Sequence, residues 1–218
     1  MIGLGNLMPT MPIRLLGNKY SIYFDGVNDY AYISQNTAMN PTASNSGFTL
    51  QFWMKNQSLT GSGVTEWTVF HNVDATNNNY LKFSIVKVGG FFHHKITLKL
   101  NNGDVVQARA SLPYASLTGG NDRWNLVTLQ IGSNVDTSDN DIRLCINDTI
   151  DVALTDEGDG DITDLGSSWA SSMSLGDGIS IAGEQVLDES DNWRAPDTAF
   201  WNGYITSLAW WSAQLTDD

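Results

Sequence analysis

The chain has 218 residues, of which 41% are hydrophobic and 16% charged, and this size and composition predict one globular domain with a single large core. Its formal net charge of -13 argues against a nucleic-acid partner, because phosphate contacts require clustered positive charge. The lone Cys145 excludes an intrachain disulfide, and no apolar run approaches the ~18 residues of a membrane helix, so no membrane partner is expected.

Residues 1–18 predict an extended or mobile arm ahead of a domain at 19–218. Glycines and prolines interrupt any apolar helix in the arm, and its single cation, Arg14, follows most of the apolar residues, so no conventional signal peptide is expected. Apolar side chains of the arm suit assembly on a neighbouring subunit. They include Ile2, Leu4, Leu7, Ile13 and Leu15.

The domain opens with two strand-like runs, 20–24 and 30–34, separated by Asp25, Gly26, Val27, Asn28 and Asp29. Aspartate, glycine and asparagine favour tight turns, so these residues predict a β-hairpin at the start of the domain.

The middle of the chain consists of short runs rich in β-branched and aromatic residues, separated by polar turns. Strands are expected at 48–55, 66–70, 80–88, 94–100, 105–110, 123–129 and 178–183, a hairpin at 141–152, and a last strand at 200–211. Most tryptophans in these strands are expected to fill the core, namely Trp53, Trp124, Trp201 and one of Trp210 and Trp211.

Two motifs near the ends of the domain carry a family resemblance. The opening Phe-Asp-Gly-Val-Asn-Asp-Tyr at 24–30 and the closing Phe-Trp-Asn-Gly-Tyr-Ile at 200–205 resemble the paired motifs of the concanavalin A-like, laminin G-like family. Runs at 48–55, 123–129, 141–152 and 178–183 resemble four further family motifs in the family's order. The resemblance implies an all-β, antiparallel two-sheet jelly-roll sandwich.

Catalysis is not expected, although several hydrolases share this family's fold. The Glu-x-Asp-x-x-Glu motif of family glycosidases is absent. Acidic clusters at 156–164 and 188–191 lie in glycine- or serine-rich sequence that predicts solvated loops. His93 and His94 are adjacent strand residues that point to opposite faces, so they do not converge on a metal. A glycoside hydrolase with a non-standard site is the second alternative function.

Calcium is the candidate cofactor, because relatives in this family hold this ion in loops at the rim of the sandwich. Asp25 and Asp29 in the opening turn, and Asp159 and Asp161 in a second acidic loop, supply the hard oxygen ligands that calcium prefers. The alternative for Asp25 and Asp29 is that they accept hydrogen bonds from backbone amides of their own turn.

Carbohydrate binding needs aromatic rings at the surface, because pyranoses stack on them through apolar C–H faces. Trp169 and Trp193 lie in small or polar segments, and Arg194 follows the second of them, so these three are the candidate sugar-binding residues. The alternative is that each loop tryptophan folds back over one end of the sandwich.

The residues favour a non-catalytic interaction module. The first candidate is a structural protein of a virus particle, because free-standing laminin G-like domains with a short glycine-rich arm resemble decoration and fibre-associated proteins of tailed phages. Its partners are other virion proteins or further copies in a homo-oligomer, and its location is the virion. The alternative is a calcium-dependent lectin that binds surface polysaccharide, with an extracellular or cell-surface location.

Deletion of residues 1–17 is expected to leave the domain folded and to abolish incorporation into the assembly, because the arm supplies contact area on a neighbouring subunit. Thermal unfolding and co-purification with assembled particles measure the two effects. Normal incorporation of the shortened chain would refute the role of the arm.

Overall fold

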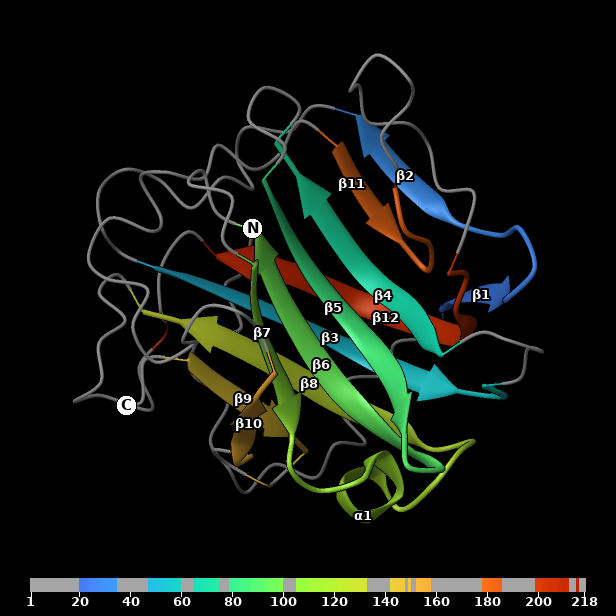
Figure 1. Ribbon diagram of the computed structural model, residues 1–218. Helices are drawn as coiled ribbons and strands as arrows, with labels where there is room; N and C mark the ends of the chain where they lie inside the picture. Colours follow the sequence, from blue (N-terminus) through green and yellow to red (C-terminus); the bar gives the residue numbers. More distant parts are fainter. Residues whose placement is uncertain are drawn as a thin grey trace.

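The computed structural model describes residues 20–34, 47–59, 65–74, 79–99, 105–132, 142–147, 149, 152–157, 178–185, 199–211 and 215. Within them the chain forms two antiparallel β-sheets, seen as two layers in Figure 1. The sheets and one short helix confirm the expected all-β, two-sheet sandwich. The arm at 1–18, with Ile2, Leu4, Leu7, Ile13 and Leu15, lies outside the described residues.

The five-stranded sheet has the order β1-β12-β3-β8-β9. Its strands are β1 (Ile22–Asp25), β12 (Asn202–Trp211), β3 (Phe48–Asn56), β8 (Trp124–Ile131) and β9 (Ile142–Ile146).

The seven-stranded sheet has the order β10-β7-β6-β5-β4-β11-β2. Its strands are β10 (Leu154–Asp156), β7 (Val105–Ala110), β6 (Phe91–Lys99), β5 (Tyr80–Val88), β4 (Glu66–Val73), β11 (Gly178–Ile181) and β2 (Ala31–Ser34). The helix α1 (Tyr114–Thr118) follows β7, and no helix among the described residues is long and apolar enough to cross a membrane.

The core lies between the inner faces of the two sheets. Along β3, Phe48, Leu50, Phe52 and Met54 are all buried, and the residues between them face outward, which is the two-residue period of a strand with one covered face. The ring of Phe52 meets that of Phe83 from the other sheet edge-on, with centroids 5.6 Å apart. Burial of each such side chain stabilises the sandwich by about 1.5–3 kcal/mol.

The expected opening hairpin is wrong, because its two strands belong to different sheets. β1 pairs with β12, whereas β2 pairs with β11 in the seven-stranded sheet. The residues between them do form a tight turn, with Gly26 at φ +77°. Turn chemistry predicts that the chain changes direction, but the partner of each strand is decided by which sheet can cover its apolar face.

The tryptophans divide between the core and the surface. Trp201 is fully buried, and Trp210 stacks on Phe48 with ring centroids 4.7 Å apart, as expected. Trp53 and Trp124, however, lie on the outer face of the five-stranded sheet, and Trp124 is 41% exposed. Trp124 lies outside because Asn125, Val127 and Leu129 take the inward positions of β8, which leaves the alternate positions on the outer face.

Two other turns match the sequence. Gly89 and Gly90 join β5 to β6 with φ +58° and +88°, which is the two-residue hairpin geometry that glycine allows. The segment after β9 turns back on it, because Thr149 and Ile146 exchange backbone hydrogen bonds and Val152 N donates to Leu144 O at 2.8 Å. The chain then crosses to the other sheet as β10.

Gly47→Ala is expected to destabilise the domain by about 3 kcal/mol, because its φ is +66° and the new Cβ lies 2.1 Å from Ile131 O. Gly89→Ala is the matched control, since its φ is +58° and nothing lies within 4 Å of the added Cβ. The control therefore measures only the cost of placing alanine in the left-handed region of backbone conformation, about 1 kcal/mol. Equal losses of unfolding free energy in the two variants, measured by urea unfolding, would contradict a clash between the new Cβ at residue 47 and Ile131 O.

Candidate functional site

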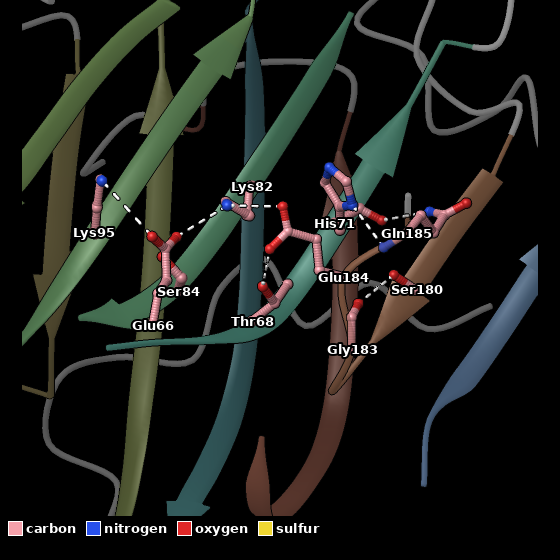
Figure 2. A network of polar contacts seen from close by, with 10 residues as sticks. All are labelled: Glu66, Thr68, His71, Lys82, Ser84, Lys95, Ser180, Gly183, Glu184 and Gln185. Atoms are coloured by element: carbon pink, nitrogen blue, oxygen red, sulfur yellow. Dashed lines mark hydrogen bonds and ion pairs between the residues drawn. The ribbon is translucent and has the colours of Figure 1, made fainter. Parts of the chain in front are cut away.

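A network of polar side chains lies on the outer face of the seven-stranded sheet, as Figure 2 shows. Strand alternation sends Trp67, Phe83 and Ile85 into the core and places the intervening polar residues on this outer face. The network consists of Glu66, Thr68 and His71 of β4, Lys82 and Ser84 of β5, Lys95 of β6, and Ser180, Gly183, Glu184 and Gln185 in and after β11.

Lys82 is the centre of the network. Its Nζ lies 3.0 Å from Glu66 Oε1 and 3.0 Å from Glu184 Oε1, and Lys95 Nζ lies 3.8 Å from Glu66 Oε2. Ser84 Oγ donates to Glu66 Oε1 at 2.8 Å. Because Lys82 is 8% exposed, these pairs are screened by solvent far less than surface salt bridges are.

The ion pairs keep the network charged. Burial by itself raises the pKa of Glu66, but Lys82, Lys95 and the hydrogen bond from Ser84 outweigh it, so the pKa is lowered. Burial lowers the pKa of Lys82, but Glu66 and Glu184 outweigh that effect and raise it. Glu66 is therefore ionised at neutral pH, and Lys82 is protonated.

His71 belongs to the same face and is neutral. Burial, followed by the charge of Lys82, lowers its pKa to about 3. Its Nδ1 accepts a hydrogen bond from Gln185 N at 3.2 Å, and Gln185 Nε2 donates to Gly178 O at 3.1 Å. His71 thus ties the segment after β11 to β4, which is a structural role that requires the unprotonated ring.

Glu66 of this network does not fit the role of the acid in a glycosidase. A glycosidase needs one carboxyl group with a raised pKa to protonate the leaving oxygen. The pKa of Glu66 is shifted in the opposite direction, and Glu66 and Glu184 share one cation. Their oxygens accept hydrogen bonds and hold strands together, but Glu66 does not carry a proton to donate.

The opening turn holds Asp25 and Asp29 as hydrogen-bond acceptors. Asp25 Oδ1 accepts from Val27 N at 2.8 Å and Asn28 N at 3.3 Å, and Asp29 Oδ2 accepts from Asp25 N at 3.2 Å. The bond from Val27 is the main cause of the lowered pKa of Asp25. Calcium takes six to eight oxygens, so a calcium site here would also need carbonyl or water ligands besides these two carboxylates. No metal-binding group of three His, Cys, Asp or Glu occurs among the described residues.

The other expected site residues lie outside the described residues, namely Trp169, Trp193 and Arg194 for sugar and Asp159 and Asp161 for calcium. His93 and His94 do point to opposite faces. His94 packs against Phe83 and Tyr114, with centroids 5.8 and 5.0 Å away, while His93 Nδ1 lies 2.9 Å from Ala110 O. Burial lowers the pKa of His94 to about 3, so it is a neutral core residue.

Three surface rings form a feature that the sequence analysis did not select. Tyr23 of β1, Tyr204 of β12 and Trp124 of β8 cross the outer face of the five-stranded sheet, and we call them the aromatic row. The ring centroids of Tyr23 and Tyr204 are 4.8 Å apart, and those of Tyr204 and Trp124 are 6.3 Å apart. Strand alternation could have placed each ring outside, but only the strand order brings them together.

No family model matches the chain, and no curated protein matches its sequence. Solved structures do resemble its fold. The chain aligns to the heptameric SAP-like pentraxin from Limulus polyphemus with a TM-score of 0.57 and 13% identity, over 90% of this chain and 77% of that one.

Two binding domains of botulinum neurotoxin are also similar. The serotype D/C binding domain has a TM-score of 0.58 and 15% identity over 92% of this chain, and the serotype D binding domain has 0.54 and 17% over 90%. The chain spans 42% and 40% of those two chains. At these identities the likeness shows the fold alone, which is a jelly roll of the concanavalin A-like, lectin type.

Lys82→Met is expected to destabilise the domain by about 2 kcal/mol at pH 7, because it leaves two partly buried carboxylates without their shared cation. The pKa of Glu66 is lowered by folding, so the wild-type advantage is full above the ordinary value of 4.5 and falls as the pH drops through the lowered value. Urea unfolding between pH 3 and 8 measures both effects.

Lys87→Met is the matched control, since Lys87 lies at the exposed end of the same strand. Its change in stability is expected to stay within about 0.5 kcal/mol at every pH. A Lys82→Met deficit that is equally small, or that does not shrink in acid, would contradict the charged network.

Proposed function

We propose that this chain is a non-catalytic interaction module whose ligand is a carbohydrate. The observation that carries the proposal is the exposure of the Tyr23 and Trp124 rings on the outer face of a sandwich of the lectin type. On the seven-stranded sheet, Lys82 pairs with Glu66 and helps to lower the pKa of that carboxyl group, so Glu66 does not serve as the acid of a glycosidase. The module thus presents surfaces for recognition.

The fold and the surface chemistry support a sugar as the ligand. The similar toxin chains are binding domains, and their jelly-roll architecture is the one described here. Sugars combine apolar ring faces with a rim of hydroxyl groups, and they are recognised by exposed aromatic rings beside hydrogen-bonding side chains. Trp124 and Tyr23, at 41% and 45% exposure, supply such rings.

A structural role on a virus particle is the more specific form of this proposal. It is supported by the short glycine-containing arm and the single cysteine of the chain, which resemble those of laminin G-like domains in tailed-phage particles. In this form the chain serves as a decoration or fibre-associated protein, with other virion proteins or further copies of itself as partners. Incorporation of the chain without residues 1–17 tests this form separately from sugar binding.

Binding of the purified chain to a broad glycan array, with calcium and again with EDTA, tests the proposal. We expect retention of one glycan class without release of shorter products. Retention only with calcium would show a calcium-dependent lectin and direct attention to the acidic loops that include Asp25, Asp29, Asp159 and Asp161. Absence of binding in both conditions would overturn carbohydrate binding, and release of shorter products would show a hydrolase or lyase.

A further inference from the structure

The aromatic row is built by the register of four neighbouring strands. Tyr23 lies opposite Tyr204, Tyr204 opposite Lys55 of β3, and Lys55 opposite Trp124, so the four side chains form one line across the sheet. All four project from the outer face, because their neighbours Phe24, Ile205, Met54 and Asn125 are buried on the inner face.

Lys55 completes the surface between the rings. Its Nζ lies 5.6 Å from the centroid of the Tyr204 ring and 3.0 Å from Asp122 Oδ1. Tyr204 and Trp124 flank Lys55 on the two neighbouring strands, with their ring centroids 6.3 Å apart. The row therefore offers aromatic faces with an ammonium group and a 69% exposed carboxylate beside them.

The shape of the row favours a narrow ligand. On one side the next outward residues are Thr206, Trp53 and Leu126, and beyond them Gln51 and Thr128 hydrogen-bond to each other at 2.9 Å. On the other side Asn202 is bonded to Asp25 O. A line of pyranose rings with hydroxyls at its edges fits this row.

The charge favours a neutral ligand. The chain carries a formal net charge of -13, which repels acidic polysaccharides at low and moderate ionic strength. The one cation in the line, Lys55, is already paired with Asp122. Stacking on uncharged aromatic faces does not require the ligand to be charged.

We propose that the aromatic row of Tyr23, Tyr204 and Trp124, with Lys55 and Asp122 beside it, binds a neutral polysaccharide by stacking its pyranose rings. This inference rests on the proposed carbohydrate-binding function and assigns it a site on the five-stranded sheet, on the opposite side of the sandwich from the Lys82 network.

Affinity electrophoresis in gels that contain hydroxyethyl cellulose, dextran, laminarin, galactomannan or alginate tests the assignment. The intact chain is expected to be retarded by at least one neutral polymer and not by alginate. Trp124→Ala and Tyr23→Ala are expected to weaken that interaction at least tenfold. Phe91→Ala is the matched control, because Phe91 is a 62% exposed aromatic at the tip of the other sheet, and it should leave retardation unchanged.

Thermal unfolding of each variant verifies that the fold is retained, and Trp124→Phe, which keeps an aromatic face, should bind with intermediate affinity. If Trp124→Ala and Tyr23→Ala are retarded as strongly as the intact chain, the aromatic row is not the binding site, although the carbohydrate-binding function stands.

If no polymer retards the intact chain, both the site and the carbohydrate-binding function are overturned. Retardation by alginate alone would overturn the neutral ligand. A change from dimer to monomer in Trp124→Ala by light scattering would show a self-interface and overturn the site.

Discussion

The last strand, β12, is the element on which the rest of the sandwich depends. It lies between β1 and β3, so the five-stranded sheet is continuous only when the end of the chain is in place. Its Trp210 stacks on Phe48 of the same sheet and lies 5.9 Å from Phe70 of the opposite one, which fixes the two layers face to face. Trp201, directly before the strand, fills the core beside Phe24.

The two outer faces of the sandwich have different chemistry because their polar groups have different partners. On the seven-stranded sheet, Lys82, Glu66 and Glu184 satisfy one another at low exposure, so most of their bonding capacity is used within the protein. On the five-stranded sheet, the rings of Tyr23 and Trp124 remain open to solvent. A face with satisfied charges stabilises the sheet, whereas a face with exposed rings is available to a ligand.

The opening turn also shows how local chemistry differs from long-range placement. Asp25 and Asp29 accept hydrogen bonds from backbone amides within their own turn, as the residue types allow. The strands on either side nevertheless go to separate sheets, which makes this turn a link across the edge of the sandwich. Local polar residues thus set the geometry of the turn, whereas the apolar faces of the flanking strands decide which sheet each strand joins.

The sequence by itself determined that the chain consists of short β-strands, because alternating apolar residues and turn residues specify strands and their ends, and the family resemblance implied their arrangement as a two-sheet sandwich. It located the ends of β3, β8 and β12 to within two residues, and it predicted the opposite orientations of His93 and His94. It did not determine which of the two faces of a strand is buried, so Trp124 was expected in the core and the aromatic row was not predicted. Only the tertiary structure decided these points, since sheet order alone brings Glu184 to the Lys82 network and brings together the rings of β1, β12 and β8, which are distant in sequence.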